Sequence, residues 1–153
     1  MGKILVTGIA GLLGSRLADW IIENTDYEVI GIDDLSGGFA ENINKKVNFY
    51  KFNLTNLKML KEVFKKENIE IIYHFAAYAA EGLSPFIRKF NYENNVIASS
   101  NLITCSIEFS IKRFVFASSM ATPSSSDGPI SQVGILTRSR VSDVPFTIAA
   151  TWS

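Results

Sequence analysis

The sequence predicts an α/β fold, a doubly wound parallel sheet with its strands in the order 3-2-1-4-5. Three observations support this prediction. Five short apolar runs alternate with stretches of helical periodicity, which indicates repeated strand–helix–strand units. The runs are almost continuously apolar, as in strands that are buried on both faces. A glycine-rich turn joins the first run to the first helix. We expect strands over residues 3–6, 28–32, 47–52, 70–75 and 113–117.

The helix that follows the first strand begins near Leu12, and residues at helical spacing form one stripe along it. We expect this stripe to face the sheet. Trp20 is then a core residue, because aromatic side chains at such spacing are usually buried. The stripe consists of Leu13, Leu17, Trp20, Ile21 and Asn24.

The helix after the third strand carries Leu57, Leu60 and Phe64 on one side, opposite a lysine-rich face that we interpret as solvated. A side-chain oxygen just before a helix can accept a hydrogen bond from its first turn. We therefore expect Thr55 or Asn53 to cap this helix.

Two polar residues of the second half are assigned to the core. His74, the only histidine, lies inside an apolar strand, which favours a packing role over catalysis. A long helix is expected from about residue 85 to residue 109, and Cys105 falls on its apolar stripe. We interpret Cys105 as a small core residue rather than a nucleophile.

The turn after the first strand holds Gly8, Gly11 and Gly14, a spacing that is typical of Rossmann-type dinucleotide sites when a strand precedes it and a helix follows. Gly8 permits a tight turn, Gly11 lets the backbone approach a pyrophosphate, and Gly14 allows close packing of helix on strand. The free N–H groups near Leu12 and Leu13 would point at the anion.

An acidic pair, Asp33-Asp34, ends the second strand. Asp33 stands 19 positions after Gly14, where a carboxylate would take the ribose hydroxyls of an adenosine and repel a 2′-phosphate. This position predicts NAD rather than NADP. The alternative is that the pair merely ends the strand, since aspartate is common in turns.

Composition narrows the class of protein. The 153 residues suffice for one domain, and 15 basic residues balance 15 acidic ones, so a basic surface for nucleic acid or an anionic membrane is not expected. A single cysteine excludes an internal disulfide and a multi-cysteine metal site, and we expect no metal. We find neither a signal peptide nor a membrane span, and we expect a soluble cytoplasmic protein.

The composition changes after Ala121. Residues 122–153 are rich in serine and threonine, contain three of the four prolines and have no lysine, tyrosine or glutamate. No long periodic segment occurs in them. We therefore expect a partial Rossmann domain over residues 1–121, and an irregular segment with little regular structure and no core of its own over 122–153.

Five motifs in the same order resemble the extended short-chain dehydrogenase/reductase family, and within it the NAD-dependent epimerases and dehydratases of sugar nucleotides, most of all those that invert C4 of UDP-glucose. The likeness covers about residues 1–121. The motifs are Thr7-Gly8-x-x-Gly11-x-x-Gly14, Asp33-Asp34-Leu35-Ser36-x-Gly38, His74-Phe75-Ala76-Ala77, Asn94-Asn95-Val96 and Phe116-Ala117-Ser118-Ser119-Met120-Ala121.

The resemblance implies a set of NAD-binding residues and one catalytic residue, Ser119. Asn53 departs from the aspartate that is usual in the family, although we expect its amide oxygen to accept from the adenine amino group. The cofactor residues are Gly8, Gly11, Leu12, Leu13 and Gly14 at the pyrophosphate, Asp33 at the ribose with Asp34 next to it in the chain, Asn53 and Leu54 at the adenine, Phe75, Ala76 and Ala77 along the cofactor, and Asn95 below the nicotinamide.

The resemblance also implies transient oxidation of the sugar at C4, with a tyrosine as base and a lysine four residues later that lowers its pKa. No Tyr-x-x-x-Lys occurs in this sequence. We therefore expect the NAD-binding part of an epimerase that is inactive alone, with a UDP-sugar as partner only if a sugar-binding part is present. Dimerisation is not expected, because the second of the two helices that the family uses for it is absent.

Three alternatives stay open at this point. The chain is a dinucleotide-binding module without catalysis, a truncated gene product, or part of a sugar-nucleotide dehydratase. A truncated product would leave the fifth strand as an exposed sheet edge, which favours aggregation.

Overall fold

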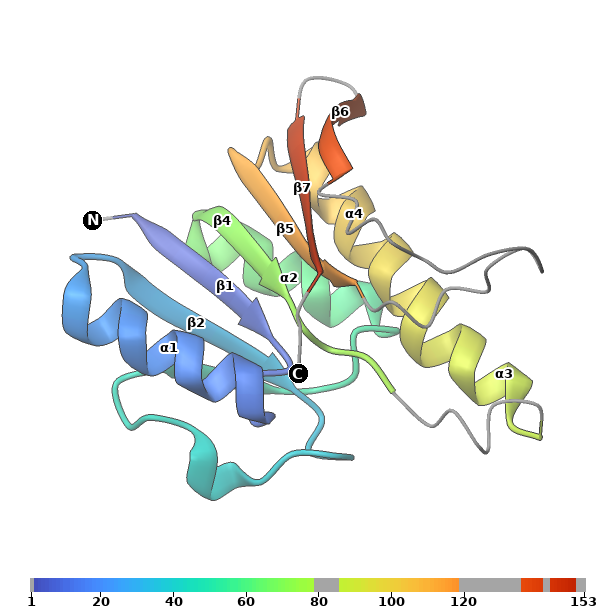
Figure 1. Cartoon of the computed structure of the whole chain (residues 1–153), viewed down its shortest axis with the longest axis horizontal. Coiled ribbons are helices and arrows are strands. Elements are labelled where there is room, and N and C mark those ends of the chain that lie inside the picture. The colour runs from blue at the N-terminus through green and yellow to red at the C-terminus, as the bar shows by residue number, and fades with distance from the viewer. Residues whose placement is uncertain (1, 79–85, 119–135, 142–143, 151–153) are drawn as a thin grey trace, which may run out of the picture.

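The computed structural model describes residues 2–78, 86–118, 136–141 and 144–150, and it shows helices on both sides of one sheet (Figure 1). The elements in chain order are β1 (Lys3–Thr7), α1 (Leu12–Asn24), β2 (Glu28–Asp33), a 3₁₀ turn (Ala40–Asn42), β3 (Asn48–Lys51), α2 (Leu57–Glu67), β4 (Ile69–His74), α3 (Arg88–Asn91), a π-helical segment (Tyr92–Ile97), α4 (Ala98–Glu108), β5 (Arg113–Ser118), β6 (Leu136–Val141) and β7 (Val144–Ala150).

The predicted strand order is confirmed, because the sheet runs β3-β2-β1-β4-β5 and these five strands are parallel. β1 lies at the centre, where Leu5 is in register with Ile30 of β2 and Ile72 of β4. From β1 the chain adds β2 and β3 on one side of the sheet and then β4 and β5 on the other side. The carboxyl ends of β1, β2 and β4 therefore meet at a topological switch point, where ligands bind in folds of this kind.

The sheet continues beyond β5, and here the structure differs from our expectation. β7 pairs with β5 in parallel and β6 pairs with β7 antiparallel, so residues 136–141 and 144–150 are strands and β5 is not an edge. Unpaired backbone groups at a sheet edge favour strand addition. The proline in β7, Pro145, precedes Phe146, the first residue in register with β5, and so costs that ladder no N–H group. The remaining residues of 122–153 lie outside the described residues.

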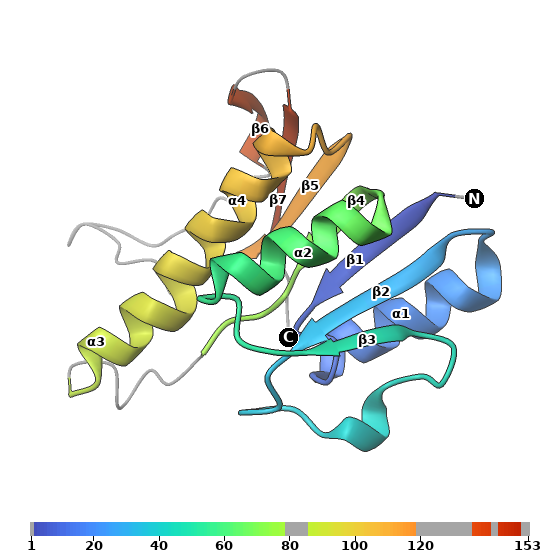
Figure 2. The same ribbon diagram turned by 180° about the vertical axis from the view of Figure 1, so that it is seen from behind.

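Alternation along the strands divides the core into two layers. Ile4 and Val6 of β1 pack with Ile21 of α1 on one face, while Leu5 packs in a larger cluster with Leu60 of α2 and other residues of α2 and α4 on the other. Figure 2 shows α2 and α4 together on the face opposite α1. Successive side chains of a strand point to opposite faces, so one apolar run supplies both layers.

The expected burial of Trp20 is wrong, because its side chain is 57% exposed. The buried positions of α1 are Gly14, Ser15, Ala18 and Ile21. Only Ile21 belongs to both the predicted stripe and the buried one. The other three buried residues are small, because the helix lies so close to the first turn that even a Cβ on Gly14 would overlap the carbonyl oxygen of Gly8.

The long helix of the second half is continuous from Arg88 to Glu108 and contains the π-helical segment, in which the N–H of Ala98 donates to the carbonyl of Glu93. Cys105 is fully buried, which confirms its core role. Burial raises the pKa of its thiol to about 11, so it is a poor nucleophile. No helix among the described residues is long and apolar enough to span a membrane.

Candidate functional site

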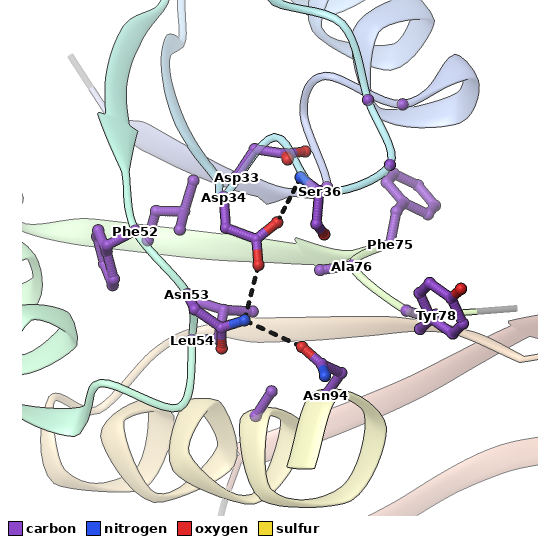
Figure 3. Close-up of a pocket in the computed structure, with 17 residues that line it drawn as sticks. Asp33, Asp34, Ser36, Phe52, Asn53, Leu54, Phe75, Ala76, Tyr78 and Asn94 are labelled. Atoms are coloured by element: carbon purple, nitrogen blue, oxygen red, sulfur yellow. Dashed lines mark hydrogen bonds between the residues drawn. The ribbon is translucent and has the colours of Figure 1, made fainter. Parts of the chain in front are cut away.

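A cleft lies at the carboxyl ends of β1, β2 and β4, at the switch point (Figure 3). Five segments contribute to it: the glycine turn, the loop after β2, the residues after β3, those after β4 and the long helix. The lining residues are Gly8, Gly11, Ile32, Asp33, Asp34, Ser36, Gly37, Gly38, Phe52, Asn53, Leu54, Phe75, Ala76, Ala77, Tyr78, Asn94 and Ala98.

A different physical reason accounts for the glycine at each of the three positions. Gly8 has φ +69°, a conformation that side chains rarely adopt, and its N–H donates to the carbonyl of Ile32 at 2.9 Å. A Cβ on Gly14 would overlap the carbonyl oxygen of Gly8. Gly11 has ordinary extended backbone, and a Cβ there would lie 3.3 Å from the same oxygen. Gly8 and Gly14 therefore shape the turn, while Gly11 keeps the cleft floor open.

The helix α1 begins at the edge of the cleft, where its N-cap residue Gly11 lines the cleft and supplies no side-chain cap. The first N–H groups of a helix lack intrahelical acceptors and carry the positive end of the helix dipole. Leu12 is 73% exposed at this end. The turn therefore offers backbone donors to an anion such as a diphosphate.

Two carboxylates follow β2. The Oδ2 of Asp33 accepts from the N–H of Ala10 at 3.0 Å and its Oδ1 from the N–H of Leu35 at 2.8 Å. These bonds tie the acidic loop to the glycine turn. Asp34 is partly buried, which opposes its ionisation, but hydrogen bonds from Ser36 and Asn53 outweigh burial and lower its pKa. None of the lining residues is a lysine, arginine or histidine.

Other groups of the protein occupy every hydrogen-bonding position of the Asn53 amide. Its Nδ2 donates to the Oδ2 of Asp34 at 2.7 Å and to the Oδ1 of Asn94 at 3.0 Å, as Figure 3 shows. Its Oδ1 accepts both the N–H and the hydroxyl of Thr55, at 2.9 and 2.8 Å. The expectation that this oxygen accepts from an adenine amino group does not fit, because both of its acceptor positions are filled.

The side chain of Asn95 also makes its hydrogen bonds within the protein, to the backbone. Its Oδ1 accepts from the N–H of Tyr78 at 2.7 Å and its Nδ2 donates to the carbonyl of Tyr78 at 3.0 Å. This pair of bonds fixes the chain after β4 against the π-helical segment. Asn95 therefore holds a wall of the cleft, and Asn94, one residue earlier, lines the cleft itself.

His74 lies behind this wall and is 2% exposed. Its Nδ1 is 2.6 Å from the Oγ1 of Thr7 and its Nε2 is 2.8 Å from the Oγ of Ser99. The Ser99 hydroxyl donates to the carbonyl of Asn95, so it accepts from a protonated Nε2, and Nδ1 accepts from Thr7. Burial lowers the pKa of His74 to about 4, which keeps the ring neutral. The predicted packing role thus includes a hydrogen-bonded bridge from β1 to the long helix.

The structure brings together most of the residues that the sequence pointed to. Nine of the predicted cofactor residues line the cleft: Gly8, Gly11, Asp33, Asp34, Asn53, Leu54, Phe75, Ala76 and Ala77. Leu12 borders an adjoining depression, and Leu13, Gly14 and Asn95 do not line the cleft. Ser119 lies outside the described residues.

Several lining residues were not predicted. Ser36, Gly38 and Asn94 belong to motifs that the sequence analysis recognised, so those motifs could have identified them as cleft residues. Phe52 and Tyr78 each stand next to a predicted residue, Asn53 and Ala77, so their place in the chain put them beside the site although no motif included them.

A profile of the NAD dependent epimerase/dehydratase family matches residues 4–138. The chain belongs to this family. Two relatives agree with this assignment. UDP-glucose 4-epimerase of Schizosaccharomyces pombe is 34% identical over 125 residues, which is 77% of this chain and 35% of that protein. UDP-glucose 4-epimerase of Bacillus subtilis is 34% identical over 123 residues, covering 76% of this chain and 36% of the relative.

Solved structures of the epimerase/dehydratase family show the same fold. UDP-glucose 4-epimerase of Thermotoga maritima, solved with UDP-glucose, matches with TM-score 0.74 and 37% identity over 76% of this chain and 38% of its own. The Thermus thermophilus enzyme, a complex with NAD, matches with TM-score 0.73 and 28% identity over 76% of this chain and 37% of its own. The chain thus spans little more than a third of the length of these relatives.

Proposed function

We propose that this chain binds NAD in the cleft, as the dinucleotide-binding part of a sugar-nucleotide 4-epimerase. One observation carries the proposal: an uncapped helix start above a bare glycine turn stands beside two carboxylates in a single cleft. Backbone N–H groups suit a diphosphate and carboxylates suit ribose hydroxyls. The relatives named for UDP-glucose 4-epimerase support the parent activity.

The residues present fit the two ends of this cofactor. The N–H groups at the first turn of α1 would hold the pyrophosphate, and the free lone pairs of Asp33 would accept from the ribose hydroxyls. Bound NAD supplies a hydride acceptor for oxidation of the sugar. The wall after β4, held by Asn95 and by a bond from the N–H of Phe75 to the carbonyl of Thr7 at 3.2 Å, would exclude water along one side.

The absence of cationic side chains from the lining residues supports NAD over NADP, because a 2′-phosphate beside Asp33 would meet only negative charge. Isothermal calorimetry with both cofactors tests this. We expect NAD to bind at least about tenfold more tightly than NADP. The variant Asp33→Asn should bind NAD more weakly, and the difference between its affinities for NAD and NADP should be smaller. The matched control is Asp26→Asn, an exposed acid in the turn before β2. Failure of NAD to bind at millimolar concentration would contradict the proposal.

We propose that the 153-residue chain does not catalyse epimerisation by itself. Its sequence has no Tyr-x-x-x-Lys, and loss of a positioned general base costs about 10²–10⁴ in rate. The test is interconversion of UDP-glucose and UDP-galactose by the purified chain with NAD. Sustained turnover above the level of a boiled sample would refute this part of the proposal and leave NAD binding unaffected.

A dehydratase parent is the second candidate. The dTDP-D-glucose 4,6-dehydratase of Dictyostelium discoideum is 33% identical over 126 residues, close to the value for the epimerases. Chimeras distinguish the two, in which residues 1–118 of this chain replace the matching part of the Schizosaccharomyces pombe epimerase or of the Dictyostelium discoideum dehydratase. Activity of the epimerase chimera alone supports the epimerase parent, and activity of the dehydratase chimera alone supports the dehydratase parent.

A further inference from the structure

The peptide between Ala10 and Gly11, inside the glycine turn, is hydrogen-bonded on both sides. The carbonyl oxygen of Ala10 accepts from the Nδ2 of Asn42 at 2.9 Å and from the N–H of Phe39 at 3.2 Å. The N–H of Gly11 donates to the carbonyl of Gly8 at 3.1 Å. The carbonyl and the N–H of a trans peptide point in opposite directions. These bonds together therefore fix the orientation of the peptide plane.

This orientation turns the Ala10 oxygen away from the cleft. Asn42 and Phe39 line the adjoining depression and not the cleft, whereas Gly8 lines the cleft. Ala10 is fully buried, and Gly38 packs on it so closely that a Cβ there would lie 2.6 Å from the Ala10 carbonyl carbon. Loss of the Asn42 amide would leave this oxygen with one hydrogen bond, the longer of the two.

Glycine at position 11 leaves this peptide free to rotate. Rotation by about 180° would change the φ of Gly11 from −79° to about +100°, which glycine adopts without strain. It would carry the Ala10 oxygen to the side of Gly8, at the cleft. The partial negative charge of that oxygen would then oppose a diphosphate bound at the start of α1. A bond that holds the oxygen on the other side therefore favours an anion in the cleft.

The segment that carries Asn42 is anchored without it. Ile43 packs against the core layer beneath α1, and the Nδ2 of Asn44 donates to the Oδ1 of Asp19 in α1 at 2.7 Å. The side chain of Asn42 is itself exposed. Truncation of Asn42 would therefore remove the bond to the glycine turn and leave the rest of this segment in place.

We propose that Asn42 is a positioning residue for the diphosphate of the dinucleotide, because its amide holds the Ala10 carbonyl oxygen away from the anion. The inference rests on the proposed binding of NAD. Asn42 lies outside the cleft and acts on the ligand through the backbone of the turn. Its effect should therefore fall on ligands that carry phosphate, and adenosine alone should be spared.

The first test is calorimetry with NAD on the full 153-residue chain and on Asn42→Ala. We expect the variant to bind NAD about three- to tenfold more weakly, the size of one hydrogen bond. Unchanged affinity would overturn the inference and leave the binding of NAD established. No binding of NAD by the unchanged chain would overturn both proposals.

The matched control is Asn44→Ala, the same truncation in the same segment, which removes a bond to α1 instead of the bond to the turn. Asn44 also accepts from the N–H of Lys46 at 3.0 Å, so in urea denaturation this control should lose at least as much stability as Asn42→Ala. It should nevertheless keep the affinity of the unchanged chain for NAD. An equal loss of affinity in both variants would overturn the inference, because the effect would then belong to the whole segment.

A second ligand separates positioning of the diphosphate from general damage to the cleft. The affinity for adenosine is measured by displacement of bound NAD, and in Asn42→Ala it should stay within about twofold of that of the unchanged chain. Circular dichroism verifies that the variant folds. A loss for adenosine as large as the loss for NAD would overturn the assignment of Asn42 to the diphosphate.

Discussion

At the scale of single residues, the polar groups behind the cleft matter as much as those that line it. His74 joins Thr7 of β1 to Ser99 of the long helix, and each hydrogen of this chain has one assigned acceptor. The rings of Phe114 and Phe116 pack against it, 6.1 and 5.3 Å away between centroids. Such a site accepts the neutral imidazole and disfavours a charged one.

Stability should therefore depend on pH through His74. Its pKa is about 4 in the folded chain and about 6.5 unfolded, so the unfolded state binds more protons between these values. The free energy of unfolding is expected to fall as the pH drops below about 6.5, with a slope approaching ~1.4 kcal/mol per pH unit. Urea denaturation from about pH 7 to about pH 5 measures it.

The control for this prediction is His74→Asn, which cannot titrate. His74 is the only histidine, so the carboxylates and the α-amino group are the other groups near this range, and the variant retains them. The variant should lose the slope between about pH 5 and about pH 6.5, whatever its absolute stability. Equal slopes in both proteins would contradict the burial of a neutral ring.

At the scale of elements, the position of α1 depends on two glycines and its ligand surface on a third. We expect Gly14→Ala to destabilise the fold by about 1–3 kcal/mol, because its Cβ overlaps the Gly8 carbonyl oxygen. Gly11→Ala has permitted backbone angles and should cost less. Denaturation curves measure which of the two variants is less stable. Calorimetry should show that Gly11→Ala binds NAD more weakly than the unchanged chain. Unchanged NAD affinity with a bulkier side chain at Gly11 would refute the diphosphate site.

The start of α2 offers a second test at this scale. We predicted Thr55 or Asn53 as its cap, but the N-cap is Asn56, whose side chain accepts from the N–H of Met59 at 3.2 Å. Asn53 instead closes its own turn onto Thr55. Asn56→Ala should lower the free energy of unfolding by about 1 kcal/mol, as measured by urea denaturation. A larger loss in Thr55→Ala than in Asn56→Ala would contradict this assignment.

At the scale of the whole molecule, β7 pairs with β5 and so keeps β5 from being an exposed edge of the sheet. Five residues of β5, from Phe114 to Ser118, are in register with β7. Without this strand the N–H and C=O groups on that side of β5 would face solvent and could pair with another molecule.

We therefore predict that a chain ending at Ser118 aggregates while the full chain does not. Light scattering over a concentration series at constant temperature measures this. A second variant, Ile148→Pro, removes one backbone donor in β7 at the position in register with Phe116, and should shift the full chain towards the same behaviour. If the shortened chain stays monodisperse and melts like the full one, β7 does not protect the edge.

Much of the site could be predicted because its signals are local. The spacing of Gly8, Gly11 and Gly14, and an acid 19 positions later, depend on backbone conformation and strand ends, which short segments specify. The donor and acceptor partners could not be predicted in this way. Asn53 meets Asn94, 41 positions away, and the direction of its amide follows from that contact.

The sequence by itself determined the order of the first five strands and the place of the cleft, because apolar periodicity and crossover handedness leave few topologies. Only the tertiary structure decided which side of α1 is buried, that β7 covers β5, and that the amide of Asn53 is already paired with other groups of the protein. Each of these depends on groups far apart in the chain competing for the same neighbour. Local pattern cannot rank such competitors, since it contains neither their distances nor the bonds that they have already made.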